Sequence, residues 1–99
     1  MIRHTVAWKF REGVDAQTEY SVLEELSRFP EEFPAMRGWT IGPNLSDRDD
    51  TYTHAFTVDF DTEDELQAYL RSEQHEMYVA TRWREVVAAR AIVTLEILG

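Results

Sequence analysis

In Tyr52-Thr53-His54-Ala55-Phe56-Thr57-Val58-Asp59-Phe60, every second side chain is a large apolar group or a histidine. Successive side chains of a β-strand point to opposite faces, so this pattern predicts a strand with one buried face. Residues 2–10 alternate in the same way and predict a second such strand. Both strands place a histidine, His4 or His54, among the large apolar side chains. A buried imidazole must find a hydrogen-bond partner, lose its charge or take part in chemistry.

A helix and a further strand are expected between these two strands. Asp15 is a candidate N-cap for a helix over residues 16–29, whose apolar side chains fall on one stripe. Pro30 and Pro34 are expected to end this helix, because proline cannot continue one. Residues 36–43 alternate again and predict a strand.

Two helical segments and a last strand are expected after residue 60. Thr62-Glu63-Asp64-Glu65 has the spacing of a capping box and predicts the start of a helix. Ser72 can cap a second helical segment, whose apolar side chains recur as far as Val87. Residues 90–98 alternate and predict the final strand.

The resulting β-α-β-β-α-β order is typical of a ferredoxin-like α+β fold, in which helices cover one face of a four-stranded antiparallel sheet. We expect one domain over residues 1–99. The large alternating side chains are expected to face the helices. The opposite face is then expected to carry smaller side chains, from Thr5, Ala7, Thr53, Ala55, Thr57, Ile92 and Thr94.

This flat face with few charges predicts a homodimer through the sheet face opposite the helices. The alternative is a monomer with one solvated sheet face, which antiparallel sheets tolerate.

Composition argues against several classes of partner. With 10 Lys and Arg against 19 Asp and Glu, the net charge is −9, which disfavours nucleic acids and anionic membrane surfaces. There is no cysteine, so neither disulfides nor thiolate chemistry is expected. The histidines have no H-x-H or H-x₃-H spacing, and we expect no metal site. No leader-like start or long apolar run is present, so a cytoplasmic protein is the default expectation.

His75 and Tyr69 are the candidate catalytic residues. The pKa of a free imidazole, about 6.5, suits His75 to act as a general base near neutral pH. Tyr69 can orient that imidazole or donate a hydrogen bond to an enolate oxygen. The alternatives are a surface or capping histidine and a core tyrosine. Because a helix break separates the two residues, periodicity does not show whether they touch.

His4 and His54 are candidate substrate-binding groups. If both line a cavity, their nitrogens can bind the oxygens of a carbonyl-rich ligand. The alternative is a pair of interior histidines whose hydrogen bonds are satisfied within the protein.

Several short motifs together resemble the stress-responsive A/B barrel (Dabb) family. His4-Thr5-Val6-Ala7-Trp8-Lys9-Phe10 resembles the H-x-V-x-x-K-F strand of that family. Pro34-Ala35-Met36-Arg37-Gly38 with Gly42-Pro43-Asn44-Leu45-Ser46 resembles its P-x-h-x-x … G-x-N-x-S stretch, and Tyr52-Thr53-His54-Ala55 its Y-T-H-h strand start. Tyr69-Leu70 with His75 resembles Y-h-x-H-P-x-H, except that Ser72-Glu73 stand where the family commonly has His-Pro. The resemblance covers nearly the whole chain and implies a dimeric α+β barrel.

The resemblance also implies an activity. The family includes a polyketide cyclase branch, that of olivetolic acid cyclase, which needs no cofactor. A helix histidine there acts as base, a tyrosine supports it, and two strand histidines line the same cavity. By resemblance, His75 and Tyr69 are catalytic and His4 and His54 bind a polyketide-like substrate. The implied reaction is a cofactor-free cyclase or lyase step, an aldol or Claisen ring closure after proton abstraction next to a carbonyl.

Two other functions stay open. The first is a non-catalytic, stress-related protein that binds small hydrophobic or aromatic ligands in the same cavity. The second is a haem-degrading monooxygenase-like protein, in which His75 would bind the iron.

Overall fold

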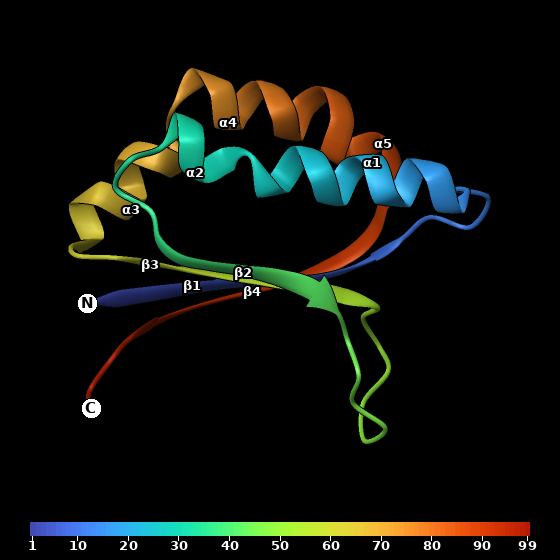
Figure 1. Ribbon diagram of the computed structural model, residues 1–99, viewed down its shortest axis with the longest axis horizontal. Coiled ribbons are helices and arrows are strands. Elements are labelled where there is room, and N and C mark those ends of the chain that lie inside the picture. The colour runs from blue at the N-terminus through green and yellow to red at the C-terminus, as the bar shows by residue number, and fades with distance from the viewer.

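The computed structural model describes all of residues 1–99 and shows the helices packed on one face of a four-stranded antiparallel sheet (Figure 1). The strands are β1 (Ile2–Phe10), β2 (Arg37–Pro43), β3 (His54–Phe60) and β4 (Val87–Glu96), in the spatial order β2-β3-β1-β4. The predicted ferredoxin-like fold is therefore confirmed, with β1 and β3 at the centre of the sheet and β2 and β4 at its edges.

The helical segments are more divided than the sequence pattern predicted. They are α1 (Ala16–Ser27), α2 (Phe29–Glu32), α3 (Glu63–Leu70), α4 (Glu73–Tyr78), the π-helix η1 (Val79–Trp83) and α5 (Arg84–Val86). None of them combines the length and the apolar character needed to cross a membrane.

Several boundaries differ from the prediction; for example, α1 ends at Ser27 and β3 begins at His54. Pro30 does not end the first helix but lies in the first turn of α2, where a missing N–H is tolerated. Val87, which the pattern placed in a helical segment, is the first residue of β4.

The three predicted N-caps are confirmed. In each, a side-chain oxygen accepts a hydrogen bond from the backbone N–H three residues later, which satisfies one of the unpaired donors of the first turn. The pairs are Asp15–Thr18 at 2.7 Å, Thr62–Glu65 at 3.2 Å and Ser72–His75 at 3.2 Å.

The hydrophobic core lies between the sheet and the helices. Its largest fully buried side chains come from both layers: Trp8, Phe60, Val58, Val22, Leu26 and Leu66. The large alternating residues of β1 and β3 thus face the helices, as the sequence predicts.

In β4, the side chains that face the helices are the ones that the sequence pattern placed on the open face. The pattern placed Ile92 and Thr94 on the open face, but they pair with Val6 and His4, whose side chains are buried beneath the helices. The open face carries Val93 instead, together with the residues two positions before and after it in the strand. The cause is a register irregularity opposite Lys9 and Phe10, because one extra residue in a strand exchanges its inward and outward side chains.

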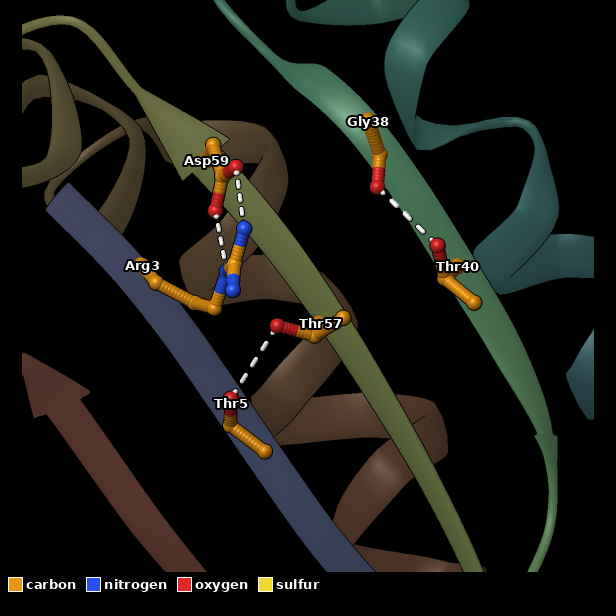
Figure 2. Close-up of polar contacts among 6 residues, drawn as sticks. All are labelled: Arg3, Thr5, Gly38, Thr40, Thr57 and Asp59. Carbon is orange, nitrogen blue, oxygen red and sulfur yellow. Dashed lines mark hydrogen bonds and ion pairs between the residues drawn. The ribbon is translucent and has the colours of Figure 1, made fainter. Parts of the chain in front are cut away.

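The open face carries polar pairs between the central strands β1 and β3 and apolar side chains on the edge strand β4. Figure 2 shows the Arg3 guanidinium donating two hydrogen bonds to Asp59, at 2.8 and 2.9 Å, and the Thr5 and Thr57 hydroxyls 3.1 Å apart. On the edge strand β4, Val93 is 56% exposed. The loop between β2 and β3 projects beyond the sheet on this same side, away from the helices (Figure 1).

Truncation of the core should be costly. Leu66 is 1% exposed, so Leu66→Ala should lower the free energy of unfolding by about 2–5 kcal/mol through lost burial and the cavity left behind. Leu45 is 90% exposed, and Leu45→Ala should change it by less than about 0.5 kcal/mol. Urea denaturation followed by circular dichroism measures both values, and equal losses would contradict this assignment of the core.

Candidate active site

A cavity of about 140 Å³ lies between the helices and the β1–β4 side of the sheet. Ten of its thirteen lining residues are hydrophobic, and the other three are His4, His75 and Arg90. An apolar cavity of about 150 Å³ is large enough to hold a benzene ring. This space is therefore large enough for one ring-sized unit with a few polar contacts.

His75 lies in the first turn of α4 with its ring orientation fixed by a backbone contact. Its Nδ1–H donates to the Leu70 carbonyl at 3.1 Å. A carbonyl oxygen can only accept, so in the neutral ring Nδ1 carries the proton and Nε2 keeps its lone pair. His75 also lines the cavity, with its side chain 19% exposed. This tautomer is the one that a general base acting through Nε2 requires.

Tyr69 lies against His75. The two rings meet edge to face, with their centroids 4.7 Å apart, although the break between α3 and α4 separates the residues in sequence. Tyr69 is 3% exposed, and burial raises the pKa of its hydroxyl. The phenol therefore remains protonated at neutral pH and can act only as a neutral donor or acceptor.

Ser72 holds these two residues in place at the helix break. Its hydroxyl donates to the Tyr69 carbonyl at 2.7 Å and accepts from the His75 backbone N–H at 3.2 Å. The departure from the family's His-Pro pattern is thus compensated locally, because Ser72 binds the end of α3 and caps the start of α4.

His4 reaches the same cavity from β1. It is 3% exposed, its Nδ1 lies 2.8 Å from the Thr94 hydroxyl on β4, and its ring centroid is 6.5 Å from that of Tyr69. The structure thus brings His4, Tyr69 and His75, three of the four candidate residues, together around one space.

His54 lies elsewhere. It is the first residue of β3, and its ring stacks on Trp8 with the centroids 5.7 Å apart and packs against Phe10 at 5.2 Å. Its Nδ1 lies 2.8 Å from the Thr53 hydroxyl. Because His54 does not line the cavity, the structure does not place it where the predicted contact with a substrate would be made.

The environment keeps the cavity imidazoles uncharged. Burial lowers the pKa of His4, and the proximity of His75 lowers it further. Burial also lowers the pKa of His75, against the opposing effects of the Leu70 carbonyl and Glu76. Removing a charge from water is unfavourable, so both rings are neutral at pH 7. The site therefore offers a lone pair at His75 in apolar surroundings, as proton abstraction requires.

Two features of the site were missed by the sequence analysis. Tyr78 lines the cavity and donates to Glu25 on α1 at 3.0 Å, while Arg82 binds the same carboxylate through two contacts at 3.0 and 3.1 Å. In the sequence, the only signal for these contacts is the four-residue separation of Tyr78 and Arg82, which is close to one helical turn. Arg90 also lines the cavity. The sequence signal for Arg90 as a site residue is its charge, which interrupts the apolar run that leads into the last strand.

No group of three or more His, Cys, Asp and Glu side chains is placed to hold a metal ion.

Comparison with known proteins agrees with this architecture. The family model for the stress responsive A/B barrel domain matches residues 2–97. No curated protein matches the sequence.

Solved structures show the same fold at low sequence identity. A Dabb family protein with a ferredoxin-like fold from Mesorhizobium loti has a TM-score of 0.88 at 20% identity, over 99% of this chain and 97% of that one. The hydroxynitrile lyase of Passiflora edulis has a TM-score of 0.87 at 17% identity, over 97% and 92%. A dimeric ferredoxin-like protein from Thermobifida fusca has a TM-score of 0.80 at 25% identity, over 97% and 90%.

Acidification should destabilise the protein before its carboxylates titrate. The folded-state pKa of His4 is below its unfolded value of about 6.5, so the unfolded state binds more protons as the pH falls from 6.5. Each such histidine lowers the free energy of unfolding by at most about 1.4 kcal/mol for each pH unit of acidification. Urea denaturation between pH 7 and pH 5 should show this loss, with a shallower slope in His4→Gln. A free energy of unfolding that rises on acidification would contradict the buried neutral state of His4.

Proposed function

This chain belongs to the stress-responsive A/B barrel domain family, and we propose that it is a cofactor-independent enzyme that removes a proton from a carbon next to a carbonyl group. The observation that carries the proposal is the hydrogen bond from His75 Nδ1 to the Leu70 carbonyl, which leaves Nε2 as a base in the cavity. The reaction proposed is an aldol or Claisen ring closure, as in a polyketide cyclase.

The proposed first step is proton transfer to His75. Nε2 takes the proton, and the C–H electron pair forms the enolate, whose oxygen accepts a hydrogen bond from Tyr69. That hydroxyl is protonated at neutral pH, and burial raises its pKa further. His4, held through its contact with Thr94, binds a second carbonyl oxygen.

Ring closure follows from the enolate. Its nucleophilic carbon attacks the second carbonyl carbon of the same substrate and forms a new C–C bond. In the aldol case, the resulting alkoxide takes the proton back from the His75 imidazolium, so that the base is regenerated. In the Claisen case, the alkoxide re-forms a carbonyl and expels the alkoxide or thiolate of the substrate ester, and this leaving group takes the proton from the imidazolium. The apolar walls fold the substrate and exclude water, which favours the intramolecular reaction over competing ones.

The size of the cavity favours a small substrate. Pockets for drug-sized ligands are about 300–1,000 Å³. With about 140 Å³, this cavity holds the unit that becomes a ring, and any longer chain must extend through the mouth. The same comparison disfavours haem, which is itself the size of a large drug.

The Passiflora edulis relative favours a second candidate, the cleavage of a cyanohydrin. In that reaction a base takes the hydroxyl proton, the C–C bond to the nitrile breaks, and cyanide leaves as a carbonyl forms. His75 can supply this base from the same position, and the small apolar cavity is large enough for such a substrate.

Deuterium exchange tests the proposed base. With cyclohexanone, a ring-sized neutral ketone, the protein in D₂O should accelerate exchange at the carbons next to the carbonyl, measured by proton NMR. His75→Ala should lower the protein-dependent rate by about 100-fold or more, and Tyr69→Phe by about 100-fold. Because the pKa of His75 is lowered, the rate should be constant near pH 7 and fall on acidification only below about 6.5.

Gln74→Ala is the matched control, because Gln74 is an exposed neighbour on the same helix that does not line the cavity. It should retain the wild-type rate. Exchange that persists in His75→Ala would remove His75 as the base. Binding of the ketone without any exchange would favour the non-catalytic alternative.

We also propose that the open sheet face forms a homodimer. Val93 and Leu95 are 56% and 44% exposed on β4, and the central strands add the short side chains of Ala7 and Ala55 to this face. Several solved relatives are described as dimeric. An exposed apolar sheet face is commonly buried against a second copy of itself.

Val93→Glu should therefore shift the protein towards the monomer, because burying a carboxylate in this face is unfavourable. Tyr20→Glu is the control, since Tyr20 is 66% exposed on α1, in the helix layer on the other face of the sheet. Sedimentation equilibrium should give a dimer for the wild type and Tyr20→Glu. Val93→Glu that dimerises as tightly as the wild type would exclude this face as the interface.

A further inference from the structure

Arg90 brings a permanent charge to the cavity wall. It pairs with Trp8 between β1 and β4 and therefore lies on the helix-facing side of the sheet. It lines the cavity but is itself exposed, as is its neighbour Ile92, which is 48% exposed. The cavity mouth is thus at the β4 edge, with a guanidinium beside it.

The guanidinium of Arg90 makes no ion pair. Arg3, Arg28, Arg37 and Arg82 each bind a carboxylate in the structure, and Arg90 does not. The five donors of a guanidinium are a planar match for a carboxylate. The charge of Arg90 is therefore available to a ligand.

The cavity is also free of acidic side chains. The protein has 19 Asp and Glu among 99 residues, yet none of them lines this cavity. Two other surface pockets differ in this respect, because one contains Glu25 and both contain Glu32. An anion entering the cavity therefore meets one cation and no lining carboxylate, although the protein as a whole carries a net charge of −9.

Arg90 lies away from the Thr94 side chain that contacts His4. It is four residues from Thr94 along β4, and Thr94 is the partner of His4. At about 3.4 Å per residue this separates the two Cα atoms by roughly 14 Å. A group bound by Arg90 is then at the mouth, away from the end of the cavity where His4 contacts Thr94.

We propose that Arg90 binds a carboxylate and so selects the substrate class: a small carbonyl compound whose carboxylate is several bonds from the acidic C–H. The assignment of that compound as a substrate depends on the proposed function, whereas the anion site does not. Arg90 acts here as a specificity-determining residue and takes no part in proton transfer.

The test compares benzoate with benzamide, a neutral molecule of nearly the same shape. Titration calorimetry at low salt should give benzoate a dissociation constant about ten-fold lower than that of benzamide in the wild type. Arg90→Gln should remove this preference while leaving benzamide binding unchanged, and Arg90→Lys should retain part of it. Raised salt should also weaken the preference, because the cation is exposed.

Arg48→Gln is the matched control. It removes the same charge from an exposed residue in the loop between β2 and β3, and it should leave the preference intact. Circular dichroism establishes that each variant is folded. Equal affinities for benzoate and benzamide in the wild type, or a preference that survives in Arg90→Gln, would overturn the proposal.

The two proposals can fail separately. A preference for benzoate that depends on Arg90, in a protein that does not exchange deuterium into cyclohexanone, would keep the anion site and reject the proposed reaction. Exchange that depends on His75, without any preference for benzoate, would keep the reaction and reject the carboxylate substrate class.

Discussion

The site depends on the burial of uncharged imidazoles between the sheet and the helices. Charging His4 there would remove an ion from water without a compensating carboxylate, so its pKa is lowered and the ring remains neutral. The same desolvation keeps His75 in its basic form and Tyr69 in its protonated form. One physical effect, the exclusion of water from an apolar layer, thus prepares both a base and a hydrogen-bond donor. In a solvated cleft the pKa of each imidazole would stay near its ordinary value of about 6.5, and part of the imidazole population would be charged at pH 7.

The helix break gives this environment its geometry. A continuous helix through residues 69–75 would place Tyr69 and His75 six residues apart, on different faces. The Ser72 hydroxyl accepts a hydrogen bond from the His75 backbone N–H and donates one to the Tyr69 carbonyl, at the point where the helix is interrupted. The centroids of the Tyr69 and His75 rings then lie 4.7 Å apart. Further along, Glu25 ties Tyr78 and Arg82 to α1. The wall of the cavity is therefore held by a few hydrogen bonds between short helices.

Strand β4 explains the two exposed surfaces. As an edge strand it has a neighbour on one side only, and its extra residue exchanges the faces expected from hydrophobicity alone. Its apolar Val93 and Leu95 consequently lie on the open sheet face, where the proposed partner would bury them. Its inward side chains include Arg90, which lies beside the cavity mouth. A single irregularity in register therefore affects both the proposed interface and the proposed selection of the substrate.

The sequence by itself determined the element order, the helix-covered face of β1 and β3, and the N-caps at Asp15, Thr62 and Ser72. These features follow from periodicity and from contacts within three or four residues, which are local properties of the chain. The tertiary structure alone decided that Tyr69 touches His75 across a helix break, that His54 stacks on Trp8 instead of lining the cavity, and that Arg90 lies at its mouth. Those outcomes depend on strand register and on the angle between helices. Because packing between distant segments sets both, no local sequence pattern indicates them.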